Sequence, residues 1–170
     1  MRILGLDPGS RRTGFGCIDS RGGTLTVIAH GCLNVAAAAP MARLRLIFEG
    51  LRALMSEHAP VEVAIERVFV SRNVDSALKL GQARGAALCA VPAGVPVFEY
   101  APRAIKLAVV GSGAAEKFQV AHMIKALLAL GERPGADAAD ALAVAVCHAH
   151  TRTLGLLAQG AELPRVRVRR

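Results

Sequence analysis

The sequence predicts one α/β domain built on a mixed β-sheet. Three strand-like segments joined by short links open the chain, which indicates an antiparallel meander. Helical and strand-like segments then alternate, as in sheets whose parallel strands are joined by helices. The chain has 170 residues, and neither an internal repeat nor a long linker divides it. We expect the domain to span residues 1–150, followed by an extension, residues 151–170, that ends in a disordered basic tail.

The first strand is defined by the apolar run Ile3, Leu4 and Leu6, which is typical of a strand buried on both faces. Asp7 closes this run. Pro8-Gly9 then stops the strand, because proline lacks a backbone donor and glycine permits a tight turn. Asp7 should therefore lie at the exposed end of a central strand. A strand-ending aspartate is most often a turn or cap residue, so its role depends on whether other acids reach the same place.

The later elements follow from turn residues and hydrophobic spacing. Ser20–Gly23 predicts a hairpin turn, and His58–Pro60 ends the first helix, whose apolar face begins at Met41. Asp75 or Ser76 is the expected cap of the next helix. The further strands are expected at 13–19, 24–33, 61–66 and 96–100, and the helices at 41–57, 76–91, 102–110, 116–130 and 136–150.

The helix expected at 76–91 carries small residues along one line. Ala77, Gly81 and Gly85 are spaced four residues apart beside Leu78 and Leu88, so another backbone could approach this helix closely. Two interpretations are equally open. The line packs against the protein's own sheet, or the helix associates with a second copy of itself.

The chain is strongly basic, with a net charge of +8. This balance favours a polyanionic partner, and nucleic acid is the first candidate. A high G+C coding bias would also explain why arginine outnumbers lysine, but it does not explain the excess of bases over acids. The chain has no apolar run near the roughly 18 residues of a membrane helix and no leader, so we expect a cytoplasmic protein without membrane contact.

The four cysteines, Cys17, Cys32, Cys89 and Cys147, are scattered, and we expect reduced core residues. Cys147-His148-Ala-His150 superficially resembles a metal cluster. Neighbouring residues on a helix point in different directions, however, so ligation is not expected there.

The acidic residues are few, and four of them have unusual positions. Glu66 ends an apolar strand as Asp7 does, and ligands of open α/β sheets bind at the carboxyl ends of strands. Asp137 and Asp140 lie three residues apart in a first helical turn and share a face. Helix capping alone would explain this pair. Four acids in apolar surroundings, however, would repel one another unless Mg²⁺ or Mn²⁺ lay between them, and a pair of such ions suits phosphodiester hydrolysis.

Four motifs, in order and at fitting spacings, resemble the RuvC family of bacterial Holliday-junction resolvases, members of the RNase H-like superfamily. The match covers residues 1–150, and its carriers are Leu6–Gly16, Ile65–Phe69, Val109–Gly113 with Ala115–Lys117, and Ala136–Ala145. The resemblance implies an RNase H-like fold with a five-stranded mixed sheet. It also implies a homodimer that binds four-way DNA junctions and cuts them by paired symmetric nicks in recombination and DNA repair, working with the RuvA–RuvB branch-migration complex.

The resemblance also assigns roles to individual residues. Asp7, Glu66, Asp137 and Asp140 match the family's metal-binding catalytic acids, which hold two Mg²⁺ or Mn²⁺ ions. Two lysines, Lys106 and Lys117, match catalytically important basic positions near the scissile phosphate.

Further DNA contacts are expected from the loop after Glu66 and from the following helix. Phe69 matches a base-stacking aromatic, and a phenyl ring in a loop just past a catalytic strand suits that role, although it could instead fold back into the core. Arg72, Lys79 and Arg84 are candidate phosphate contacts, with solvated surface charge as an equal alternative.

Two other functions fit parts of the sequence. Asp-x-Gly before a hairpin also resembles the first phosphate loop of the actin–hexokinase ATPases, but the chain has neither a second such loop nor the length for a second domain. A DNA-binding module that has lost catalysis would have no reason to keep four mutually repelling acids.

Overall fold

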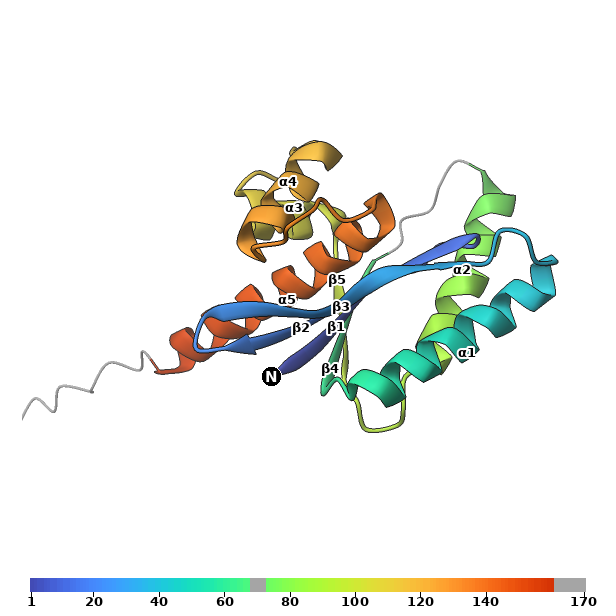
Figure 1. Cartoon of the computed structure of the whole chain (residues 1–170), viewed down its shortest axis with the longest axis horizontal. Coiled ribbons are helices and arrows are strands. Elements are labelled where there is room, and N and C mark those ends of the chain that lie inside the picture. The colour runs from blue at the N-terminus through green and yellow to red at the C-terminus, as the bar shows by residue number, and fades with distance from the viewer. Residues whose placement is uncertain (68–72, 161–170) are drawn as a thin grey trace, which may run out of the picture.

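The computed structural model describes residues 1–67 and 73–160, and within them a five-stranded sheet lies between two layers of helices (Figure 1). The strands are β1 (Arg2–Asp7), β2 (Arg12–Arg21), β3 (Thr24–Asn34), β4 (Glu62–Glu66) and β5 (Val97–Tyr100). The helices are α1 (Pro40–His58), α2 (Val74–Cys89), α3 (Pro102–Val110), α4 (Lys117–Leu127) and α5 (Ala136–Gly160).

The sheet has the order β3-β2-β1-β4-β5 and confirms the predicted mixed topology. The first three strands form an antiparallel meander, and β4 and β5 then add in parallel to β1. This order places β1 at the centre, with β2 on one side and β4 on the other. Two strands that run in the same direction, β1 and β4, thus end side by side.

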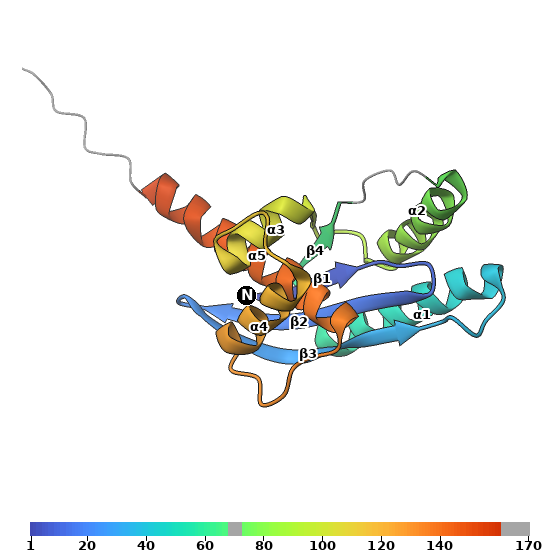
Figure 2. The same cartoon turned by 90° about the horizontal axis from the view of Figure 1, so that it is seen from above.

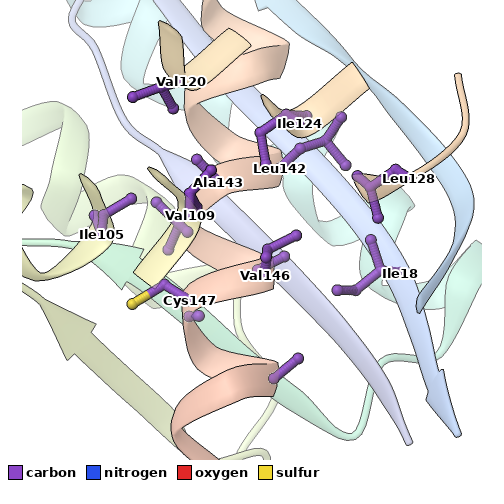
Figure 3. Close-up of a cluster of buried hydrophobic side chains, with 14 of the residues drawn as sticks. Ile18, Ile105, Val109, Val120, Ile124, Leu128, Leu142, Ala143, Val146 and Cys147 are labelled. Carbon is purple, nitrogen blue, oxygen red and sulfur yellow. The ribbon is translucent and has the colours of Figure 1, made fainter. Parts of the chain in front are cut away.

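Helices α1 and α2 lie on one side of the sheet, and α3, α4 and α5 lie on the other (Figures 1 and 2). Alternate residues of β1 serve the two layers. Leu4 and Leu6 join the core under α1, whereas Ile3 joins the core that Figure 3 shows between the sheet and α3 to α5. Each fully buried leucine or isoleucine contributes about 1.5–3 kcal/mol, so both layers are held by apolar burial.

The central helix α5 is longer than predicted. It continues to Gly160 instead of ending near His150. The hydroxyls of Thr151 and Thr153 donate to the carbonyls of Cys147 and Ala149, one turn earlier. Threonine satisfied in this way does not stop a helix. The basic tail predicted at the end of the chain lies outside the described residues.

Several other expectations need correction. Helix α2 is capped by Asn73, whose side chain accepts from the Ser76 amide at 3.1 Å, and neither Asp75 nor Ser76 is the cap. Met41 is 77% exposed, because the buried face of α1 begins only at Ile47.

The cysteines divide into two pairs. All four are free, but only Cys17 and Cys147 are buried, so the prediction of core positions is wrong for Cys32 and Cys89. None of the helices in the described ranges is both long and apolar enough to cross a membrane.

Candidate active site

Asp7 and Glu66 are neighbours at the carboxyl ends of β1 and β4. The ladder pairs Leu6 with Ile65, so the next residue on each strand is the acid. Side chains alternate along a strand, and Ile3 and Ala64 face α5. Asp7 and Glu66 therefore emerge on the α5 side of the sheet, and both lie at the edge where β1 and β4 end.

Helix α5 begins directly over this edge. Gly14 pairs with Asp7 in the adjacent strand β2, and a β-carbon at Gly14 would overlap the carbonyl oxygen of Asp137. Only a residue without a side chain lets the first turn of α5 approach the sheet this closely. The close approach brings Asp137 and Asp140 to the strand ends that carry the other two acids.

The acids influence one another's protonation. Burial, then the charges of Asp140 and Asp137, raises the pKa of Asp7 to about 6. Burial, then the charges of Asp7 and Asp140, raises the pKa of Glu66 to about 7. Like charges close together in a partly desolvated place produce shifts of this kind, which are typical of functional sites.

Two lysines reach the same place. Lys117 Nζ lies 2.9 Å from Asp140 Oδ2, and this hydrogen bond raises the pKa of Lys117. The charge of Lys106 partly offsets the rise in the pKa of Glu66. A cavity of about 220 Å³ is lined by the two lysines, Glu66 and Asp140. Its other walls are Pro102, Ile105, Val120 and Ala143.

Asp137 has two partners that the sequence did not predict. Arg12 Nη1 lies 3.7 Å from its Oδ2, and the Cys32 thiol donates to the same oxygen at 3.4 Å. Arg12 begins β2 and Cys32 lies opposite Gly14 in β3, so both come from the meander beside β1. No local sequence signal reveals them, because the register of that hairpin shifts by one residue between Cys17 and Ile18.

The chemistry of this donor set suits hard divalent cations, which prefer carboxylate oxygens. Among the side chains that the structure describes, however, no three acids, histidines or cysteines are assembled as a ready-made metal site. Asp140 bonds to Lys117, and Asp137 to Arg12 and Cys32. The site therefore combines an excess of carboxylates with basic groups that balance part of their charge.

The expected DNA contacts have different surroundings. Phe69 and Arg72 lie outside the described residues. Lys79 Nζ pairs with Asp75 Oδ2 at 2.5 Å on the surface of α2. Arg84 is largely buried, donates to the Glu66 carbonyl and pairs with Glu99 at 2.6 Å, so it anchors the end of β4.

Comparisons with known proteins agree with this fold. The family model described as "Crossover junction endodeoxyribonuclease RuvC" matches residues 3–148. The RuvC protein of Halorhodospira halophila is 57% identical over 159 residues, covering 92% of this chain and 95% of that protein. The Marinobacter nauticus RuvC protein is 56% identical over 149 residues, covering 87% and 85% of the two chains.

A solved structure is also similar. Thermus thermophilus RuvC, in complex with a Holliday junction substrate, superposes with a TM-score of 0.85 at 33% identity, covering 91% of this chain and 96% of that one. The matched region contains all four acids and both lysines of the site. The chain therefore belongs to the RuvC family of crossover junction endodeoxyribonucleases, which are nucleases with an RNase H-like fold.

Proposed function

We propose that this protein is a structure-selective endonuclease that binds four-way DNA junctions as a homodimer. It resolves them by paired symmetric nicks, in recombination and DNA repair. The observation that carries this proposal is the meeting of Asp7, Glu66 and Asp140 with Lys117 at one edge of the sheet. The likeness to a RuvC in complex with a Holliday junction substrate supports the choice of DNA.

Asp7, Glu66, Asp137 and Asp140 would hold two Mg²⁺ or Mn²⁺ ions. When bound, the ions would supply an activated water and stabilise the leaving oxygen of the phosphodiester. The raised pKa values of Asp7 and Glu66 support this assignment, because a carboxylate cluster in a partly dry site favours positive charge between its members. Asp140 and Asp137 would exchange their present basic partners for the ions.

The two lysines would orient the DNA. Lys117 is 82% exposed and rests against Asp140, so its ammonium can move from this carboxylate to an incoming phosphate. Lys106 lines the cavity from α3, opposite the start of α4. Two ammonium groups that flank one phosphate would fix the scissile bond over the acids and balance the charge that develops during cleavage.

The homodimer is supported by the exposed face of α2. Leu78 is 64% exposed and Val74 is 70% exposed, and a β-carbon at Gly81 or Gly85 would meet nothing within 4 Å. Of the two interpretations of this helix, its line of small residues thus favours association with a second copy. A twofold axis through such an interface would relate two active sites, as symmetric nicking requires.

Other parts of the proposal rest on the family alone. Phe69 would stack on a base near the crossover, and Arg72, Lys79 and Arg84 would contact phosphates or support residues that do. The RuvA–RuvB complex would supply the junction. A chromosomal DNA substrate would place the protein in the cytoplasm.

The test is incubation of the protein with a mobile four-way junction and Mg²⁺ or Mn²⁺. We expect nicks at symmetric positions in two opposed strands. Asp7→Asn should abolish cutting and keep junction binding, because it removes a carboxylate and leaves the basic surface intact. A wild-type protein that binds the junction and cuts with neither metal would show instead a DNA-binding module without catalysis.

A further inference from the structure

The contact between α5 and the sheet is built largely from small residues. Many buried positions of α5 are alanines, and at the centre of the sheet a β-carbon on Gly5 would overlap the Ala141 carbonyl oxygen. Alanine against glycine permits close approach, and the buried side chain of Leu142 packs directly over Gly16. A shift of the helix by one turn, about 5.4 Å, would lose these contacts, and buried polar partners add to the preference for one position.

A polar cluster lies farther along α5, where the helix passes over β4. His148 is fully buried, and its Nε2 lies 2.5 Å from Glu62 Oε2. The hydroxyl of Tyr100 lies 2.7 Å from His148 Nδ1, and Arg152 Nη2 lies 2.9 Å from Glu62 Oε1. These four residues are called the His148 cluster below. Glu62 opens strand β4 and is only 7% exposed.

Every polar atom at the centre of the His148 cluster is used. Burial lowers the pKa of His148, so the neutral ring donates through Nε2 to Glu62 and accepts the Tyr100 hydroxyl proton at Nδ1. A shift of α5 by one turn would leave a buried carboxylate and a buried ring without partners. Buried unpaired groups are strongly unfavourable, and fixing one register is the best-attested use of buried polar groups.

Strand β4 and helix α5 each carry members of both the His148 cluster and the set of proposed catalytic acids. Glu62 and Glu66 stand on the same face of β4, about 13 Å apart for four residues of strand. Asp140 and His148 stand on one stripe of α5, about 12 Å apart for eight residues of helix. One end of this contact thus joins Glu62 to His148, and the other brings Glu66 near Asp140. Figure 2 shows α5 crossing the strands obliquely.

We propose that the His148 cluster is a positioning device that fixes the axial register of α5 on the sheet and thereby sets Asp137 and Asp140 against Asp7 and Glu66. The effect of the cluster on catalysis rests on the function proposed above, whereas its effect on the position of α5 does not. The cluster touches no reacting atom, so its members act through the acids.

Two substitutions of Glu62 separate the effect of its hydrogen bonds from the effect of its negative charge. Glu62→Ala removes both contacts. In Glu62→Gln the amide can donate to His148 Nε2 while the other tautomer of the ring donates to Tyr100, and the amide oxygen still accepts from Arg152. We expect Glu62→Ala to weaken Mn²⁺ binding by about tenfold, because Asp137 and Asp140 would no longer be held against Asp7 and Glu66, and Glu62→Gln to stay within about twofold of wild type.

The measurements are Mn²⁺ titration by electron paramagnetic resonance and amide hydrogen exchange of residues 136–144 without metal. Exchange should be faster in Glu62→Ala and unchanged in Glu62→Gln. Tyr100→Phe, which removes one hydrogen bond, should act in the same direction and serves if Glu62→Ala does not fold. The matched control is Ile47→Val or Ile47→Ala, whichever lowers the melting temperature by the same amount as Glu62→Ala. Ile47 lies in the core on the opposite face of the sheet, so its substitution should not move α5.

Two results would overturn the proposal. One is wild-type Mn²⁺ affinity and exchange in both Glu62→Ala and Tyr100→Phe, and the other is an equal loss in the Ile47 control. If the wild-type protein binds no Mn²⁺, the proposed metal chemistry fails. The comparison of amide hydrogen exchange still tests whether the His148 cluster fixes the position of α5, because that measurement uses no metal.

Discussion

Asp7 and Glu66 end adjacent parallel strands, where burial and the neighbouring acids disfavour their charged forms. In the unfolded chain both carboxylates would be solvated and far apart, with ordinary pKa values. The folded protein without metal is therefore less stable at neutral pH than the same fold with one of these charges removed. This link between a single charge and the stability of the whole domain gives two predictions at the scale of the residue.

The first prediction concerns Asp7→Asn. Removing this charge should stabilise the metal-free protein at pH 7.5 by about 1–2 kcal/mol, less than the full pKa shift would give because solvent screens the site. Chemical denaturation measures the effect. Asp75→Asn, which changes an exposed acid of α2, is the control and should differ little. A loss of stability in Asp7→Asn would contradict the assigned repulsion.

The second prediction concerns pH. Folding raises the pKa of Glu66 to about 7 and that of Asp7 to about 6, so the folded state takes up protons before the unfolded state does. Stability from these groups should therefore rise as the pH falls from 8 to 6. The lowered pKa of His148 works in the opposite direction, but it is shared by wild type and variant. The free energy of unfolding of the wild type minus that of the double variant Asp7→Asn/Glu66→Gln should increase as the pH falls from 8 to 6. A difference that does not change with pH would contradict the raised pKa values of Asp7 and Glu66.

At the scale of the element, the strand ends were predictable and the partners of Asp137 were not. A short apolar run closed by an acid identifies β1 and β4 from sequence alone. The β2–β3 hairpin, by contrast, has a register irregularity between Cys17 and Ile18. That irregularity shifts every later pair by one residue and brings Cys32 opposite Gly14. Counting from the turn would instead place Gly31 opposite Gly14, so the sequence alone does not reveal the pairing.

The buried polar residues were missed for a related reason. Glu62 has the sequence surroundings of a surface residue, and only the arrival of α5 above β4 gives it His148 and Arg152 as partners. The length of α5 was missed because threonines usually disfavour helix interiors. Local patterns thus predict elements and the acids at their ends, whereas contacts between distant segments need the packed structure.

The close approach of α5 to β2 gives the third prediction. Gly14→Ala should push the first turn of the helix away from the sheet, because the added methyl overlaps the Asp137 carbonyl. We expect a loss of about 1–3 kcal/mol in stability and weaker metal-dependent cutting. Gly155→Ala, with nothing within 4 Å of the added atom, is the control and should leave cutting unchanged. Equal behaviour of the two variants would argue against the close approach.

At the scale of the whole molecule, the proposed function requires two copies of the chain on one DNA junction. Leu78→Glu should yield a monomer in analytical ultracentrifugation, because it places a charge in the exposed apolar face of α2. Paired nicking should decrease as the dimeric fraction of the protein decreases. Val61→Glu, which changes an exposed position just before β4, is the control. A Leu78→Glu protein that stays dimeric would move the interface elsewhere.

The basic surplus of the chain complements the phosphates of a junction, while the acids are gathered at one sheet edge beside two lysines. The proposed function therefore requires metal ions to contact the scissile phosphate itself. Replacing a non-bridging oxygen of that phosphate by sulfur tests this contact, because Mg²⁺ binds sulfur poorly and Mn²⁺ tolerates it better. Cutting of one sulfur diastereomer should fail in Mg²⁺ and recover in Mn²⁺. Equal cutting of both diastereomers in both metals would contradict a metal-bound phosphate at this site.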